Sequence, residues 1–134
     1  MWERDYVGLR FLSGGRDRSG VDCWGLCRLV YRDQLGIDLP TYGEISANEL
    51  RKVARQMQSG QDQDPWRAVG DPQAFDIAVM TGGQGRVTTH VGIMIDKKRL
   101  LHIERHADVC VEPRNALIIS QRILGFRRHA EVSA

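Results

Sequence analysis

Cys23 is the residue whose position most strongly suggests chemistry. It directly follows Asp22 at the expected start of a helix, and a glycine-rich loop over residues 13–20 precedes both. A helix N-terminus carries unpaired amide donors and partial positive charge, and both favour the thiolate, which is the nucleophilic form of cysteine. We therefore expect Cys23 to have a lowered pKa and to react before the other two cysteines. The alternative is a structural cysteine, because cysteine is among the most buried residue types.

A thiolate nucleophile needs a base, and two histidines lie on strands that we expect to be neighbours. The alternation of apolar and polar residues over 88–104 predicts two strands joined by a three-residue loop at 96–98. This register pairs Gly92 with His102 and places His90 and His102 on one face as diagonal neighbours. Gly92 then leaves room for the imidazole of His102. A two-residue loop would put the histidines on opposite faces, so the interpretation depends on loop length.

The remaining pattern predicts the elements that position these side chains. A helix starts at Cys23 and ends near Gly36, with Gly25 allowing another backbone to approach closely. A second helix is expected from Ser46 to about Gly60. An ordered surface connection should follow over 61–74, and then strands at 75–80, 88–95, 99–104, 109–111 and 122–127. Helices first and short strands afterwards predict an α+β domain with N-terminal helices packed on a mostly antiparallel sheet.

Composition excludes several classes of protein. The 134 residues, of which 42% are hydrophobic and 27% charged, predict one globular domain over 1–134. A net charge of +2 gives no basis for nucleic-acid binding, and no apolar run reaches the roughly 18–20 residues of a membrane span. Residues 1–6 lack the features of a signal peptide, so we expect any export to use another route. His129 is expected in an exposed C-terminal tail.

The cysteines and histidines also raise the alternative of a metal site. Cys23 and Cys27 are one helical turn apart, and His102 and His106 offer two further nitrogens. Residues four apart on a strand are too widely spaced for one metal ion, so we expect no metal and no cofactor. Three cysteines without a C-x-x-C pair also argue against a disulfide framework. We expect Cys27 and Cys110 to be core residues.

Three segments together resemble the NlpC-type cell-wall cysteine peptidases. They are Gly20–Leu26, His90–Ile93 and His102, and the Asp-Cys-Trp-Gly-Leu run is typical of the bacteriophage tail branch of that family. The resemblance extends from about Tyr6 to Arg127. It implies a compact papain-like fold. It also implies that Cys23 is the nucleophile, that His90 is general base and then acid, and that His102 orients His90.

The resemblance further implies a substrate and a reaction. The reaction is hydrolysis of an amide bond in peptidoglycan stem peptides, between D-γ-glutamate and a diamino acid, through a thioacyl-enzyme. The backbone amide of Cys23 is expected to stabilise the oxyanion. Tyr6, Phe11, Asp22 and Trp24 are the candidate substrate-binding residues. Phe11 departs from the family pattern, because many relatives carry a tyrosine there, and Tyr6 is the candidate to supply the missing hydroxyl.

The phage tail branch implies where the protein acts. We expect peptidoglycan as substrate, other tail-tip proteins as partners, and neither nucleic-acid binding nor membrane insertion. We expect the protein in the virion tail, assembled in the host cytoplasm and acting at the bacterial cell wall or periplasm. The alternative is a catalytically weak or inactive peptidase-fold component of the tail tip. Phe11 favours that alternative, whereas the complete set of Cys23, His90 and His102 opposes it.

Overall fold

The computed structural model describes residues 1–39, 66–81, 88–104 and 107–132. The expected second helix, the turn at 82–85 and His106 lie outside these ranges. No helix in the described ranges combines the length and the apolar character that a bilayer crossing requires.

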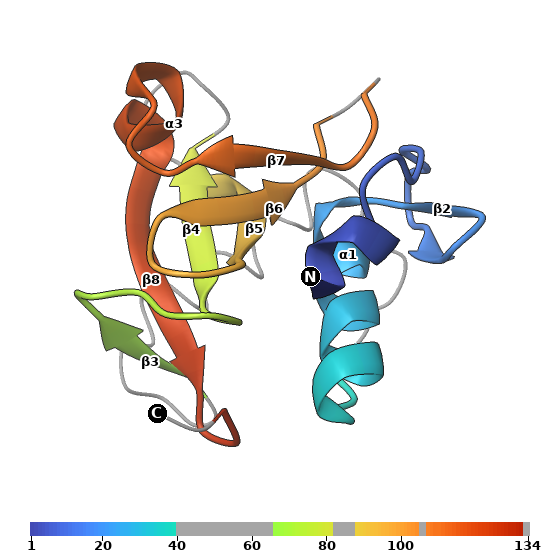
Figure 1. Ribbon diagram of the computed structural model, residues 1–134, viewed down its shortest axis with the longest axis horizontal. Coiled ribbons are helices and arrows are strands. Elements are labelled where there is room, and N and C mark those ends of the chain that lie inside the picture. Colours follow the sequence, from blue (N-terminus) through green and yellow to red (C-terminus); the bar gives the residue numbers. More distant parts are fainter. Residues whose placement is uncertain (40–65, 82–87, 105–106, 133–134) are drawn as a thin grey trace.

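The helical elements of the N-terminal half confirm the expected helix from Cys23. A single 3₁₀ turn, η1 (Trp2–Asp5), precedes α1 (Cys23–Val30), which continues into a wider π-helical turn, η2 (Tyr31–Leu35) (Figure 1). Gly36 ends the helix with a φ of 66°, a left-handed conformation that glycine adopts without strain. Nearly every side chain of α1 is buried, because its apolar residues recur at helical spacing.

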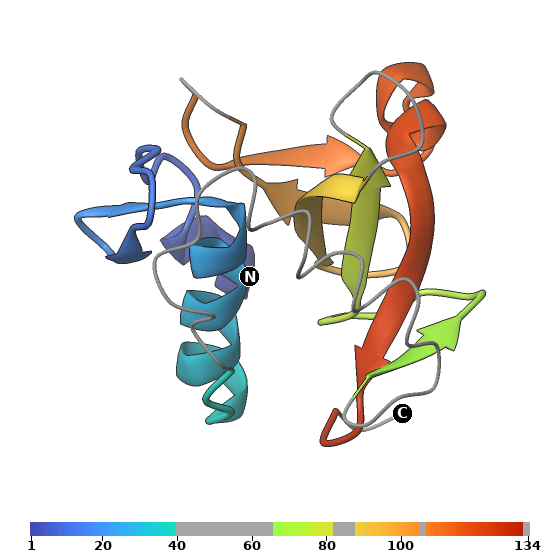
Figure 2. The same cartoon turned by 180° about the vertical axis from the view of Figure 1, so that it is seen from behind.

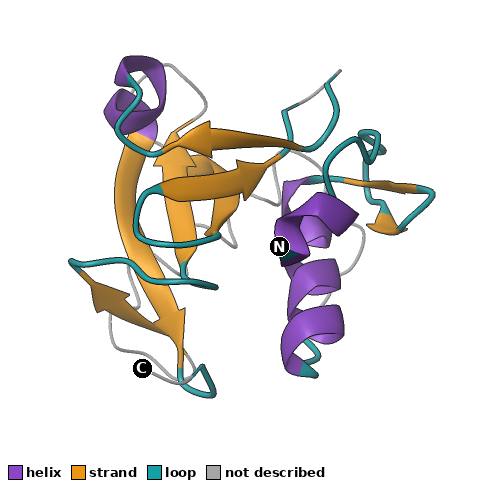
Figure 3. Ribbon diagram, in the orientation of Figure 1, coloured by secondary structure: helices purple, strands orange, loops and turns teal. Residues whose placement is uncertain are grey.

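The described strands form one six-stranded sheet and a separate two-stranded ribbon (Figure 3). Across the sheet the order is β3 (Trp66–Val69), β8 (Ile123–His129), β4 (Ile77–Thr81), β5 (Thr88–Met94), β6 (Arg99–His102) and β7 (Cys110–Pro113). Every neighbouring pair is antiparallel. The ribbon of β1 (Arg16–Asp17) and β2 (Gly20–Val21) directly precedes α1. The α+β class with an antiparallel sheet is therefore confirmed.

The two faces of the sheet bury different cores, because side chains alternate along each strand. One face packs against α1 and includes Ile77, Val91, Ile93 and Leu101. The other face forms a smaller core of Ala78, Met80, Met94, Leu100, Ile119 and Phe126, to which the short helix α3 (Leu117–Arg122) contributes. Figures 1 and 2 show the strands of the sheet between α1 and α3.

Three features of the C-terminal half differ from the sequence-based expectations. Residues 66–69 are not a surface connection but strand β3, which pairs with β8. His129 is not in an exposed tail, because it ends β8 and its buried ring packs edge-on against Trp66 at 5.0 Å. Helix α3 was not expected, since its six residues are too few to show a helical period and Leu117 and Ile118 are exposed.

A close contact between glycines fixes the start of α1. A Cβ atom added to Gly25 would lie 2.0 Å from the carbonyl oxygen of Gly15, and one added to Gly15 would lie 2.3 Å from the carbonyl oxygen of Gly20. The expected close approach of another backbone to Gly25 is thus confirmed. The glycine-rich loop and the first turn of α1 pack backbone against backbone.

We predict that Gly25→Ala destabilises the protein by at least about 2 kcal/mol, because the new methyl group overlaps the Gly15 carbonyl. An ordinary helical glycine would instead gain about 0.5–1 kcal/mol on replacement by alanine. Urea unfolding measures the difference. Gly70→Ala is the control, because nothing lies within 4 Å of its added Cβ. Equal stability of the two variants would contradict the contact.

Candidate active site

Asp22 joins the glycine-rich loop to the start of α1. Its Oδ1 accepts a hydrogen bond from the Gly25 amide at 2.7 Å, and its Oδ2 accepts one from the Gly14 amide at 3.1 Å. Arg16 Nη1 donates to the same carboxylate at 2.7 Å. Asp22 is therefore the expected N-cap. These hydrogen bonds give Asp22 a structural role at the start of α1, and its candidate role in substrate binding stays a prediction.

Cys23 is the first residue of α1, and its side chain is almost completely buried. Burial raises the pKa of the Cys23 thiol to about 12, and hydrogen bonding from the backbone amides of Val91 and Trp24 offsets only part of that effect. The sequence-based expectation of a lowered pKa is therefore wrong for the free protein. Loss of water around the sulfur outweighs the helix N-terminus.

His90 and His102 lie together, as the hairpin register predicts. Strand β5 pairs with β6 through Ile93–Leu101 and Met94–Leu100, which is the register of a three-residue loop. His90 Nε2 lies 2.9 Å from His102 Nδ1, and both imidazoles are buried. The shared face of the two histidines is thus confirmed.

Gly92 leaves the space that the His102 side chain occupies. A Cβ atom added to Gly92 would lie 3.2 Å from the Cβ of His102 and 2.8 Å from Cδ1 of Leu100. Both distances are shorter than an ordinary van der Waals contact, so a side chain at position 92 would require its neighbours to shift. The sequence-based reason for a glycine opposite His102 therefore holds in the structure.

The sulfur of Cys23 lies where β5 and β6 separate. The β5–β6 ladder stops at Ile93–Leu101, one pair short of Gly92–His102, and the Val91 amide instead acts on the Cys23 sulfur. In the described part of the chain no hydrogen bond joins that sulfur to an imidazole nitrogen. Catalytic hydrogen bonds are often longer before substrate binds.

The contact between the histidines determines which nitrogen of His90 remains for chemistry. Nε2 of His90 is engaged with His102, so Nδ1 is the nitrogen that can exchange a proton with a thiol. Burial lowers the pKa of His90 well below its ordinary value, the nearby Glu104 opposes this, and His102 and Arg122 add to it. The resting pair is therefore a neutral thiol and a neutral imidazole.

Glu104 and Arg122 complete the site and were not among the sequence-based candidates. Oε1 of Glu104 lies 3.7 Å from His90 Nε2 and 3.8 Å from His102 Nδ1. Arg122 Nη1 donates to the same oxygen at 2.5 Å, and its Nε donates to the carbonyl oxygen of Thr81. Burial alone would raise the pKa of Glu104, but His90 and Arg122 outweigh it and lower that pKa.

One of these two residues left a signal in the sequence. The hairpin register places Glu104 opposite His90, so its position beside the imidazoles follows from the same pairing that aligns the histidines. Arg122 left none, because it lies at the end of the unexpected helix α3 and reaches Glu104 only through the tertiary fold.

The remaining candidate substrate-binding residues, Trp24, Tyr6 and Phe11, lie in different surroundings. The indole of Trp24 is fully buried, so it cannot contact a substrate. The hydroxyl of Tyr6 donates to Asp33 Oδ2 at 3.0 Å, ten residues beyond Cys23 and roughly 15 Å along the helix. The structure therefore does not bring that hydroxyl to the sulfur. Phe11 is half-buried and pairs with Val21, two residues before Cys23.

The other cysteines have different surroundings. Cys27 is a core residue, as expected, whereas Cys110 is partly exposed on β7. Two groups of described side chains are close enough to share a metal ion, and both contain His102. Neither includes Cys23 or Cys27, and His106, the remaining member of the metal set considered from the sequence, lies outside the described residues.

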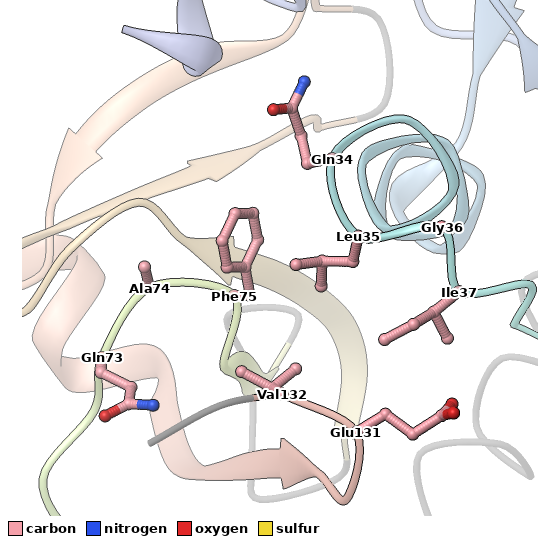
Figure 4. Close-up of a pocket in the computed structure, with 9 residues that line it drawn as sticks. All are labelled: Gln34, Leu35, Gly36, Ile37, Gln73, Ala74, Phe75, Glu131 and Val132. Atoms are coloured by element: carbon pink, nitrogen blue, oxygen red, sulfur yellow. The ribbon is translucent and has the colours of Figure 1, made fainter.

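A separate pocket of about 640 Å³ lies beyond the C-terminal end of α1 (Figure 4). It is lined by residues 34–37, 73–75 and 131–132, with the Leu35 and Phe75 side chains pointing into the same space. None of the candidate catalytic residues lines it. The pocket is therefore distinct from the site at the N-terminal end of α1.

The family model described as "NlpC/P60 family" matches residues 8–128, which include the nucleophile motif and both histidines. The chain belongs to the NlpC/P60 family. Similar curated proteins include "Murein DD-endopeptidase MepS/Murein LD-carboxypeptidase" of Escherichia coli K12, 27% identical over 92% of this chain and 57% of that protein. A "Probable endopeptidase" of Haemophilus influenzae is 25% identical over 94% of this chain and 70% of that protein. The chain thus spans little more than half of the Escherichia coli relative.

Solved structures of NlpC/P60 proteins share the fold. The NlpC/P60 domain of the peptidoglycan hydrolase SagA superposes with a TM-score of 0.59 at 22% identity, over 92% of this chain and 89% of that domain. An NlpC/P60 family protein of Bacillus cereus gives a TM-score of 0.65 at 24% identity, over 95% of this chain and 37% of that protein. The papain-like α+β fold expected from the sequence is therefore confirmed.

We predict that Cys23 of the free protein reacts slowly with iodoacetamide near neutral pH, at least about 100-fold slower than after unfolding, because the reagent needs the thiolate. Cys110, which is partly exposed, should react first and the buried Cys27 last. Mass spectrometry of tryptic peptides over a pH series measures each rate. Unfolded protein, in which the three thiols should react alike, is the control. Native Cys23 reacting ahead of Cys110 would contradict the raised pKa.

Proposed function

We propose that this chain is a cysteine peptidase that hydrolyses amide bonds in peptidoglycan stem peptides. The observation that carries the proposal is the bonded pair of His90 and His102. Strand β5, which carries His90, also supplies the Val91 amide that favours the thiolate of Cys23 at the capped start of α1. The names of the Escherichia coli relative and of SagA, a murein endopeptidase and a peptidoglycan hydrolase, support the substrate class.

The proposed reaction starts from the neutral pair. As the Cys23 sulfur attacks the carbonyl carbon, Nδ1 of His90 takes the thiol proton, and the Cys23 backbone amide donates to the oxyanion. His90 then gives that proton to the departing amine, which leaves a thioacyl-enzyme. Water adds to the thioester with His90 again as base, and collapse releases the carboxylic acid product and the thiol.

The neighbours of His90 stabilise the charged intermediate. Nε2–H of His90 donates to Nδ1 of His102 at 2.9 Å, which keeps Nδ1 of His90 free to act as base. The Glu104 carboxylate, 3.7 Å from His90 Nε2, favours the imidazolium that forms during attack. Arg122 anchors that carboxylate.

We predict that the acid limb of kcat/KM lies below the ordinary histidine pKa of about 6.5, because burial lowers the pKa of His90. His90 is then neutral, and able to accept a proton, at more acidic pH than an exposed histidine. Rates on a purified muropeptide over a pH series measure the limb. Glu104→Gln removes the charge that opposes the shift, so its limb should lie lower still. A limb above 6.5 would contradict this assignment of the base.

The finer assignments are also proposals. We propose that the bond cleaved joins D-γ-glutamate to the diamino acid and that the chain acts in a bacteriophage tail tip, with other tail proteins as partners. The support is the Asp-Cys-Trp-Gly-Leu run at residues 22–26, which resembles that branch of the family. The Escherichia coli relative is named for a DD-endopeptidase and an LD-carboxypeptidase, so the two specificities predict different products.

Digestion of peptidoglycan tests both the proposed peptidase activity and the proposed bond specificity. We predict that the purified protein releases new termini from muropeptides and that Cys23→Ala lowers the rate by at least about 10⁴-fold, because the sulfur forms the covalent bond. Mass spectrometry identifies the bond. Cys27→Ala, which removes a thiol but no catalytic group, is the matched control. Cleavage at a D,D bond would overturn the D-γ-glutamyl assignment alone.

Position 11 carries phenylalanine, without the hydroxyl of the tyrosine found in many relatives. This favours a second candidate function, that of a catalytically inactive structural component of the tail tip. Tyr6 does not replace that hydroxyl, because its own is bound to Asp33. Equal, negligible cleavage by the wild-type protein and by Cys23→Ala would support this candidate and overturn the peptidase. Restored cleavage in Phe11→Tyr would instead identify the missing donor as the cause.

A further inference from the structure

The second nitrogen of His102 has no partner. Nδ1 of His102 is engaged with His90, whereas Nε2 is buried and makes no hydrogen bond. A buried polar atom without a partner costs free energy, and the side chain that carries it is 2% exposed. The proposed catalytic role occupies only the Nδ1 side of this ring.

Two metal-ligating side chains stand next to that ring. Cys110 on β7 is the direct cross-strand partner of His102 on β6, and Glu112 lies two residues farther along the same face of β7. Cys110 Sγ lies 4.0 Å from Glu112 Oε1. A ring nitrogen of His102, this sulfur and a Glu112 carboxylate oxygen all lie within 4.8 Å of one another.

An ion can reach this group from outside. Strand β7 lies at one edge of the six-stranded sheet, and Cys110 and Glu112 are both partly exposed. Because Nδ1 is held by His90, Nε2 is the His102 nitrogen that remains for a ligand. Thiolate, imidazole and carboxylate are the three ligand types that zinc prefers, and three protein ligands leave the fourth position for water.

We propose that His102 Nε2, Cys110 Sγ and the Glu112 carboxylate form a Zn²⁺ site that inhibits the enzyme. Binding releases the Cys110 thiol proton to solvent and moves the His102 hydrogen from Nε2 to Nδ1. Nδ1–H then donates to His90 Nε2, so the hydrogen of His90 must sit on Nδ1. That nitrogen can no longer take the proton of Cys23.

The inhibitory consequence rests on the proposed peptidase function, whereas metal binding does not. Binding is therefore measured first and without activity, in Cys23→Ala, where the catalytic thiol cannot be the ligand. Co²⁺ is the probe, because a cobalt–thiolate bond gives a near-ultraviolet charge-transfer band. The other group of described side chains that is close enough to hold a metal ion consists of His90, His102 and Glu104. It contains no sulfur and cannot give that band.

Cys23→Ala should bind one Co²⁺ with the charge-transfer band, and Zn²⁺ should displace it. Cys23→Ala with Cys110→Ala should lose the band. Zn²⁺ affinity should fall by more than about 100-fold, since loss of even an outer partner of a metal site costs roughly 10–100-fold. Circular dichroism checks that both proteins fold. Absence of the band in folded Cys23→Ala, or its persistence without Cys110, overturns the site.

Inhibition is then measured as the ratio of muropeptide cleavage with and without Zn²⁺ for each protein. The ratio should fall well below one as Zn²⁺ is added to the wild type and stay near one for Glu112→Gln, for which the metal-free rate serves as its own reference. Equal inhibition of the two would place the inhibitory ion elsewhere and overturn the proposal. A cobalt band without any cleavage by the metal-free wild type would leave the metal site standing and count against the peptidase.

Discussion

The hydrogen bonding of the buried Asp22 carboxylate is the interaction on which the placement of Cys23 depends. An ionised group taken out of water must find donors, and Asp22 finds them in Arg16 and in two backbone amides from separate segments. Those donors can converge only because the loop and the first turn of α1 touch without side chains between them, at Gly15 and Gly25. The direction of α1, and with it the position of Cys23, follows from this contact.

Polar groups are also buried around His90 and His102, and they are stabilised there by different contacts. The Glu104 carboxylate pairs with Arg122, and the two imidazoles share one hydrogen bond. Burial of the Cys23 thiol keeps it protonated until a substrate arrives. The Cys23 thiol therefore becomes reactive only when a substrate binds. A thiol that stays protonated in the free protein is also less easily oxidised.

The sequence predicted correctly those features that depend on interactions between residues close together in the chain. The cap at Asp22, the helix end at Gly36 and the alignment of His90 with His102 each follow from residues close in sequence, and the structure confirms them. The pKa of Cys23 was wrong because burial is a property of the whole fold, which the helix terminus alone does not reveal. Strand β3 was missed because polar and proline residues surround Trp66, and because its pairing partner, β8, lies about 60 residues later in the sequence.

The two histidines are positioned by one hairpin, whereas Cys23 is positioned by a separate helix. The proposed base and its orienting residue lie on one continuous stretch, His90 to His102, and their alignment follows from strand alternation, Gly92 and the short loop at 96–98. The position of Cys23, by contrast, is set by a separate helix and the loop before it. A substitution that shifts the start of α1 therefore leaves the mutual alignment of the two histidines intact.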